Sequence, residues 1–184
     1  MKDTVDANKT EKNSDGVLDW LKSLCITFAV VVLLFTFVVR TAVVNGSSMT
    51  DTLQDGDFLI LWSLFYSPDQ GDIIAANCEG LDEVIVKRII ATEGQTVDID
   101  FSTGSVYVDG ELLDEPYIRN LTLNDEGGFT YPVTVGEGQY FVMGDNRQGS
   151  RDSRDASVGL VDREDILGKV VLRLYPFSDL TVFS

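Results

Sequence analysis

The sequence predicts a mostly β protein, with a coiled, partly closed antiparallel β-sheet domain behind one N-terminal transmembrane helix. Two observations carry this prediction. An apolar run near the N-terminus is long enough to cross a bilayer. The residues after it form short β-branched or aromatic runs, separated by turns rich in glycine or aspartate. Many short strands need closure to protect their edges, so a partly closed sheet is expected.

Composition excludes several classes of function. The 184 residues include no histidine and two cysteines, and 30 acidic against 14 basic side chains give a formal charge of −16. A Ser-His-Asp triad, a Cys-His dyad and a His-ligated zinc site are therefore impossible. The negative charge also opposes nucleic-acid binding, which depends on neutralising phosphates. If the protein is an enzyme, it works without imidazole, and we expect no metal or other cofactor.

The N-terminal region divides into a polar tail, residues 1–22, and an apolar anchor, residues 23–44. The run from Leu24 to Val39 is interrupted only by two threonines. Extending it through Arg40 to Val44 reaches the ~20 residues that a bilayer span needs. Arg40 can extend its charge to the interface. The tail is expected to be solvated and mobile.

Two other interpretations of the apolar run were weighed. A cleaved signal peptide would be followed by a small-residue site, which residues 41–45 match poorly. A helix of a soluble domain is the other alternative, but a helix packed on the surface of a small domain would show a polar face, which this run lacks. Four lysines precede the run, and after Arg40 no Lys or Arg occurs until Lys87. The positive-inside rule therefore places the tail in the cytoplasm and residues 45–184 outside.

Residues 45–184 are expected to form an extracytoplasmic catalytic β domain. A small insertion is expected around residues 115–135, which contain Gly127-Gly128 and two prolines, and one short helical turn at 162–167. Residues 58–66 suit either a core strand or an apolar rim in the outer leaflet. The expected strands are 84–86, 89–91, 97–101, 106–108, 140–143 and 170–174.

Serine activated by a neutral lysine is one chemistry open to a hydrolase without histidine. Four segments follow the anchor in chain order: Gly46-Ser47-Ser48-Met49-Thr50-Asp51-Thr52-Leu53, Gly71-Asp72-Ile73-Ile74, Lys87-Arg88-Ile89-Ile90-Ala91 and the run from Gly144 to Arg154. In this order they resemble the boxes of bacterial signal peptidase I. The last box matches the family pattern at every fixed position. The resemblance covers the anchor and nearly all of the outer domain.

The resemblance implies that Ser48 is the nucleophile and Lys87 the general base. One departure is Asp51, which stands where the family has a proline. A proline would stiffen the turn behind the nucleophile, so its replacement affects the loop's rigidity but removes no catalytic atom.

The residues around Lys87 also suit a neutral amine. A free lysine has a pKa of ~10.4, so a value of ~7 requires a shift of ~3.4 units, which burial can supply. In a strand over residues 84–90, Lys87 shares its face with Ile85 and Ile89. That face is apolar, as a depressed lysine pKa requires.

Other roles also follow from the resemblance. We expect Arg88 to pair with Asp145, Ser150 to hydrogen-bond the Lys87 amine, and Asp152 with Arg154 to brace that loop. Shallow pockets for the small −1 and −3 side chains of the substrate are expected near Met49, Leu53, Ile85 and Val86.

The function implied is that of a membrane-bound serine endopeptidase that removes N-terminal signal peptides from exported preproteins. The expected partners are preproteins with A-x-A type signal peptides and the lipid bilayer, without nucleic acid. The alternative is a non-catalytic or substrate-dedicated paralogue that assists assembly of a surface structure such as a pilus.

Overall fold

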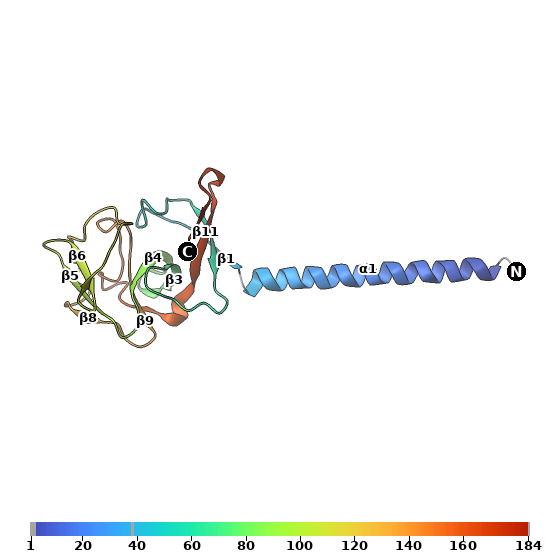
Figure 1. Ribbon diagram of the computed structural model, residues 1–184, viewed down its shortest axis with the longest axis horizontal. Helices are drawn as coiled ribbons and strands as arrows, with labels where there is room; N and C mark the ends of the chain where they lie inside the picture. Colours follow the sequence, from blue (N-terminus) through green and yellow to red (C-terminus); the bar gives the residue numbers. More distant parts are fainter. Residues whose placement is uncertain (1–2, 38, 184) are drawn as a thin grey trace. The chain divides into compact units, whose positions relative to one another are not determined.

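The structure, a computed structural model, describes residues 3–37 and 39–183 and divides at residue 38 into an N-terminal helix and a β domain (Figure 1). The helix α1, Asp3–Phe37, contains the stretch Gly16–Leu33, whose length and apolar composition suit a membrane span. The predicted N-terminal apolar helix is therefore confirmed.

The C-terminal end of the predicted anchor differs in the structure. The helix begins at Asp3 and therefore also includes the segment predicted to be a polar tail. It ends at Phe37, and Val39–Val43, assigned to the anchor from the sequence, instead form strand β1. Arg40 pairs with Leu61 of the neighbouring strand, and its guanidinium donates to the Leu167 carbonyl at 3.5 Å. The β-branched Thr41 and Val43 favour this extended conformation.

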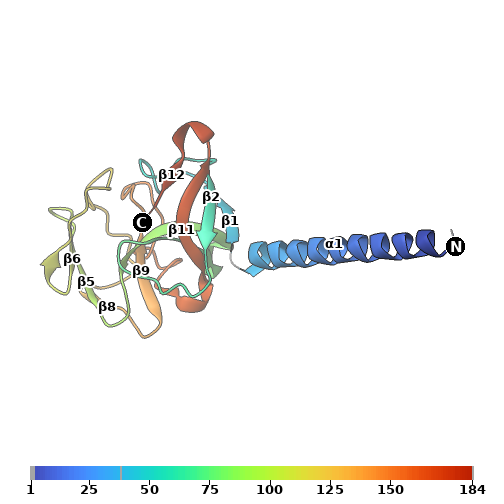
Figure 2. The same cartoon turned by 45° about the vertical axis from the view of Figure 1, so that its right-hand side comes forward.

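Strands within the described residues form two antiparallel sheets (Figure 2). The larger has the order β1-β2-β11-β3-β4-β9-β10, and β12 also pairs with β11. Its strands after β1 are β2 Phe58–Trp62, β3 Ile73–Cys78, β4 Glu83–Ala91, β9 Gln139–Met143, β10 Val161–Asp162, β11 Ile166–Tyr175 and β12 Thr181–Val182. Three short 3₁₀ segments, η1 Glu79–Leu81, η2 Arg163–Asp165 and η3 Phe177–Asp179, lie between strands. The turn expected at 162–167 is η2.

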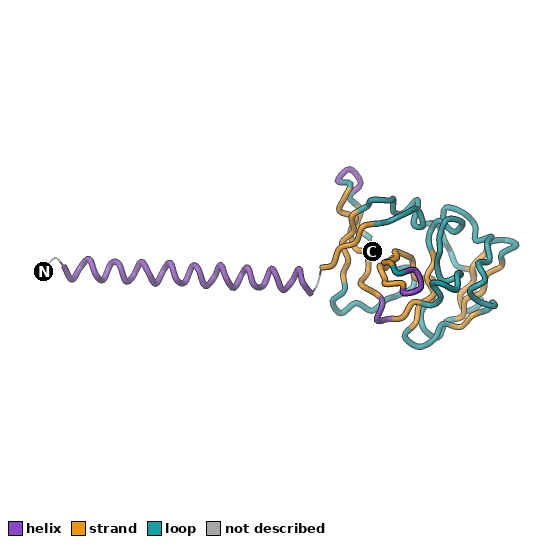
Figure 3. The backbone as a smooth tube through the Cα atoms, turned by 180° about the vertical axis from the view of Figure 1, so that it is seen from behind, coloured by secondary structure: helices purple, strands orange, loops and turns teal. Residues whose placement is uncertain are grey.

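The smaller sheet has the order β7-β6-β5-β8. Its strands are β5 Thr96–Asp100, β6 Ser105–Val108, β7 Glu111–Leu112 and β8 Val133–Thr134. Between β7 and β8 the chain runs through a long irregular segment, one of the loops drawn in teal in Figure 3. The mostly β, antiparallel class is confirmed. The expectation of partial closure is wrong, because β1 and β10, the two end strands of the larger sheet, do not pair with each other.

The apolar core fixes the position of strand β4, which carries Lys87. Alternate residues of β4 enter different apolar clusters, since Ile85 and Ile89 pack in one and Val86 in another. Of the run 58–66, only Phe58–Trp62 form a strand, in which Leu59 and Leu61 are buried in the core. Trp62 and Phe65, at and beyond the end of that strand, remain exposed.

Candidate active site

Ser48 lies on the irregular segment that joins β1 to β2. Two backbone hydrogen bonds close the base of this segment, from Val44 N to Asp57 O and from Gly56 N to Val44 O, both at 2.9 Å. Met49 and Leu53 are fully buried in the cluster that includes Val44. Burial of the residues that follow Ser48 therefore holds the loop against the domain and leaves the serine itself partly exposed.

Lys87 reaches Ser48 from the middle of β4. Its Nζ lies 2.8 Å from Ser48 Oγ and 3.2 Å from the Val86 carbonyl oxygen, and it donates a hydrogen bond to each. The residue is only 5% exposed. Desolvation by this burial lowers the pKa of Lys87, and the negative charges of Asp152 and Glu83 oppose the shift. The arrangement favours a neutral amine in contact with a hydroxyl.

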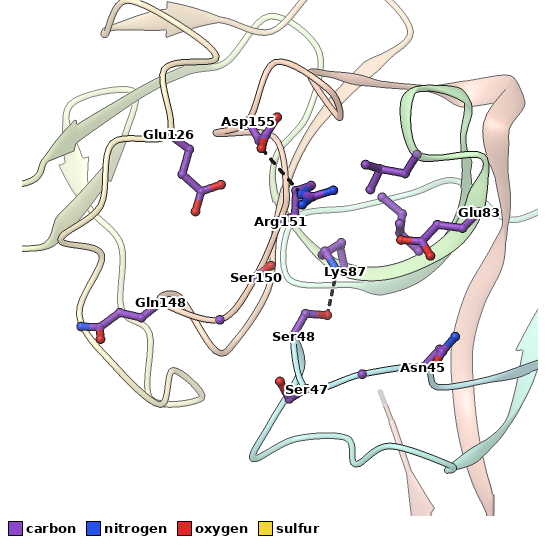
Figure 4. A pocket seen from close by; sticks show the side chains of 14 residues that line it. Asn45, Ser47, Ser48, Glu83, Lys87, Glu126, Gln148, Ser150, Arg151 and Asp155 are labelled. Atoms are coloured by element: carbon purple, nitrogen blue, oxygen red, sulfur yellow. Dashed lines mark hydrogen bonds and ion pairs between the residues drawn. The ribbon is translucent and has the colours of Figure 1, made fainter.

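The pair opens onto a cavity of about 530 Å³ (Figure 4). One wall is formed by the Asn45–Ser48 segment and another by the first residues of β4 with Leu81. A third wall comes from Glu126 and the loop that follows β9. The lining consists of Asn45, Gly46, Ser47, Ser48, Leu81, Glu83, Ile85, Lys87, Glu126, Gln148, Gly149, Ser150, Arg151 and Asp155.

The four residues expected near the substrate pockets do not lie together. Ile85 lines the cavity, but Met49, Leu53 and Val86 do not. Those three side chains pack together in an apolar cluster beneath the nucleophile loop. Their apolar character therefore stabilises the loop, and this geometry gives them no direct surface for a substrate.

Asp145 joins the segments that carry Ser48 and Lys87. It accepts hydrogen bonds from Arg88 Nε at 2.9 Å and Nη2 at 2.7 Å, which is the pairing expected from the sequence. Its Oδ2 also accepts a hydrogen bond from Thr52 Oγ1 at 2.5 Å. Arg88 follows Lys87 in the chain and Thr52 lies on the loop that carries Ser48, so one buried carboxylate connects the segments of these two residues. The contact from Thr52 was not predicted.

Asn146 and Gly144 hold the loop after β9 against the segment that carries Ser48. The backbone N–H of Asn146 donates a hydrogen bond to the Ser48 carbonyl oxygen at 2.9 Å, and its side-chain Nδ2 donates one to the Ser47 carbonyl oxygen at 3.1 Å. A Cβ on Gly144 would lie 2.5 Å from the Ser48 carbonyl oxygen and would overlap Ser150 Oγ. Glycine at this position therefore permits the close approach of the two segments.

Ser150 differs from its expected role. It is buried and lines the cavity, but its Oγ makes no hydrogen bond to any residue that the structure describes. The expected bond to the Lys87 amine is therefore not present in this geometry. The other expected brace is present, because Arg154 donates to Asp152 from Nε at 2.8 Å and from Nη2 at 2.9 Å.

Asp51, the departure from the family pattern, lies on the surface. Its carboxylate is paired with Arg119 Nη1 at 3.4 Å, with both side chains largely exposed. The chain therefore retains the Ser48–Lys87 contact without a proline at this position.

Sequence reasoning missed Thr52, Asn146 and the carboxylates of the cavity wall. Thr52 and Asn146 stand inside the two boxes that were identified, but their partners lie far away in the chain. Glu83 could have been found from the strand alternation that was used for Lys87, because residues two and four positions before a lysine share its face.

A serine in contact with a buried lysine is the kind of site that serine hydrolases without histidine use. A sequence model of the family described as "Signal peptidase, peptidase S26" matches residues 17–175. The chain is 33% identical to signal peptidase I of Bacillus licheniformis over 186 residues, covering 96% of this chain and 97% of the relative. It is 36% identical to signal peptidase I of Bacillus amyloliquefaciens over 184 residues, covering 94% and 95%. The chain belongs to the signal peptidase family, peptidase S26.

Among solved structures, the crystal structure of a signal peptidase I from Enterococcus faecalis is 30% identical to this chain. The two superpose with a TM-score of 0.49, over 57% of this chain and 97% of that one.

Proposed function

We propose that Ser48 and Lys87 are the catalytic dyad of a membrane-anchored serine endopeptidase that removes signal peptides from exported preproteins. The contact of 2.8 Å between Lys87 Nζ and Ser48 Oγ carries the proposal. Membership of the signal peptidase family supports the activity, and the N-terminal apolar helix supports the anchoring.

In the first half of the reaction, Ser48 Oγ attacks the scissile carbonyl carbon while neutral Lys87 accepts the hydroxyl proton. The backbone N–H of Ser48 donates to the oxyanion that forms. The tetrahedral intermediate collapses by breaking the C–N bond, and the Lys87 ammonium protonates the leaving amine. The mature protein leaves, and the signal peptide remains as an ester on Ser48.

In the second half, the same amine deprotonates a water molecule that attacks the ester. Collapse of the second intermediate releases the signal peptide as a carboxylic acid and returns the proton to Ser48. Both halves need the amine in its neutral form, and the burial that lowers the Lys87 pKa serves this need.

The substrate lies extended along the edge of β4. Strand β3 pairs with β4 from Glu83 to Arg88, whereas β9 pairs with it only from Arg88 onward. Within the described residues, the β9-side edge of Glu83–Lys87 is therefore free of a strand partner and borders the cavity. A peptide can add to this edge by β-augmentation. Ile85 forms an apolar wall beside it, which suits small side chains at −1 and −3.

The catalytic domain works outside the membrane. Four lysines precede the span, whereas more than forty residues after Arg40 contain no Lys or Arg. This asymmetry of positive charge keeps the N-terminal segment in the cytoplasm. Addition of external protease to intact spheroplasts tests this orientation, because only outward-facing segments are cut. We expect fragments from residues 45–184 and an intact N-terminal epitope tag.

Cleavage of a labelled preprotein in detergent tests the dyad. We expect wild type to cut after an A-x-A sequence, and Ser48→Ala and Lys87→Ala each to lose at least about a thousandfold in rate. Ser178→Ala, which changes an exposed serine in η3, serves as the matched control and retains full activity. Replacing the −1 or −3 alanine by a large residue blocks cleavage. Absence of cutting by folded wild type on several preproteins favours the non-catalytic or substrate-dedicated paralogue.

A further inference from the structure

We propose that Glu83 makes the enzyme selective for the residue at position −5 of the signal peptide, favouring a basic side chain there and disfavouring an acidic one. This inference rests on the proposed function, because it concerns the substrate that the Ser48–Lys87 site cuts. It adds a charge preference to the expected preference for small residues at −1 and −3.

The first step is the alternation of β4. Glu83, Ile85 and Lys87 all line the catalytic cavity, whereas Val84 and Val86 do not. Residues two apart on a strand share one face, so these three side chains form a single row toward the substrate. Glu83 is the outermost of the row, four residues from the proposed base.

The second step is the register of a bound peptide. A substrate that adds to the free edge of Glu83–Lys87 has the same spacing of about 3.3 Å per residue as the strand. With the −1 residue beside Lys87, where Ser48 attacks, the −3 residue lies beside Ile85 and the −5 residue beside Glu83. The −1, −3 and −5 side chains share one face of the peptide, so the residue that meets Glu83 is the one at −5.

The third step assigns this half of the cavity to the signal peptide. In Figure 4, Glu83 and Asn45 lie on one side of the Ser48–Lys87 pair, and Gln148 and Glu126 lie on the other. The side with Glu83 is also lined by the apolar Leu81 and Ile85. Small apolar side chains at −1 and −3 fit that side better than the polar wall opposite.

The fourth step is charge. Three carboxylates line the cavity, and two of them have an arginine nearby, because Asp155 lies 3.8 Å from Arg151 and Glu126 lies 3.8 Å from Arg154. Glu83 forms no ion pair with any residue that the structure describes, and it is exposed. A basic side chain on the substrate would supply the missing cation. Because the Glu83 charge also raises the pKa of Lys87, neutralising it assists the neutral amine.

Three peptides that differ only at −5, with Lys, Gln or Glu, provide the test. We expect wild type at low ionic strength to prefer Lys over Glu about fourfold to twenty-five-fold in kcat/KM, since the attraction to Lys and the repulsion of Glu each contribute about twofold to fivefold. Glu83→Gln removes the preference, and Glu83→Lys reverses it. Added salt reduces the preference in wild type.

Two controls isolate the position. Glu79→Gln removes an equal, exposed charge from η1, outside the cavity lining, and retains the wild-type preference. The same substitutions at −4, which faces away from Glu83, give no preference. Cleavage of all peptides at equal rates, or a preference that survives Glu83→Gln, overturns this inference and leaves the proposed function intact. Failure of wild type to cut any of them overturns both.

Discussion

Thr52 donates a hydrogen bond to Asp145 across 2.5 Å, and the same carboxylate accepts two hydrogen bonds from Arg88. Thr52 belongs to the loop that carries Ser48, and Arg88 follows Lys87 in β4. The three residues therefore form a bridge between the proposed nucleophile and the proposed base. Asp145 is fully buried, so water does not compete for the hydrogen bonds that its carboxylate accepts.

Replacing Thr52 by valine, which has the same shape without the hydroxyl, breaks the bridge on the nucleophile side. We expect kcat to fall by about tenfold to a hundredfold with little change in KM, because a small misplacement of a reacting group has effects of this size. Steady-state kinetics on one preprotein measure both constants.

The matched control is Thr96→Val, the same substitution in the smaller sheet, where the hydroxyl contacts Thr134. It should leave kcat unchanged. Full activity of Thr52→Val, with a melting temperature equal to that of wild type, would mean that the bridge does not position Ser48.

Replacing Lys87 by methionine should remove activity and raise stability. Burial lowers the native pKa of Lys87 below its unfolded value of 10.5, so the unfolded chain binds more protons between the two values. Wild-type stability therefore rises as the pH increases through that interval. At pH values below both pKa values, each unit by which burial lowers the pKa of Lys87 reduces the free energy of unfolding of the wild type by about 1.4 kcal/mol.

Thermal unfolding of both proteins from neutral to alkaline pH measures this effect. Lys87→Met should be the more stable at neutral pH, and its advantage should shrink as the pH approaches 10.5. An advantage that does not change with pH would indicate improved packing alone.

Ser150→Ala separates two roles for a buried hydroxyl. Ser150 Oγ has no partner among the described residues, so removing it should leave the melting temperature unchanged or slightly raised. If the hydroxyl contacts the amine or the substrate during the reaction, kcat falls about tenfold or more in the same variant. Unchanged kinetics would assign Ser150 no part in catalysis.

The sequence predicted the elements whose signals are local. Short β-branched runs indicated strands, and the boxes around Ser48 and Lys87 indicated the pair that the structure brings within hydrogen-bonding distance. The pairing of Arg88 with Asp145 was also expected. The strands follow from residue type and alternation, which a sequence displays directly, whereas the Ser48–Lys87 pair and the Arg88–Asp145 pairing were implied by the resemblance to bacterial signal peptidase I.

Features that depend on tertiary packing were not predicted. Thr41 and Val43 suit a strand as well as a span, and pairing with β2 decides between them. Met49 and Leu53 are apolar residues beside a nucleophile, and only their burial shows that they belong to the core. The partner of Thr52 lies 93 residues away, and no local pattern reports it.

The pH dependence of kcat/KM tests the central claim, that a neutral Lys87 activates Ser48. Activity should rise with pH through one ionisation, with an apparent pKa that lies below 10.5 because burial lowers that of Lys87. The amine of Lys87, followed by NMR after selective isotope labelling of lysine, should titrate with the same value. A rate limited by an ionisation near 4, or a Lys87 amine that stays protonated where the enzyme is fully active, would contradict the account.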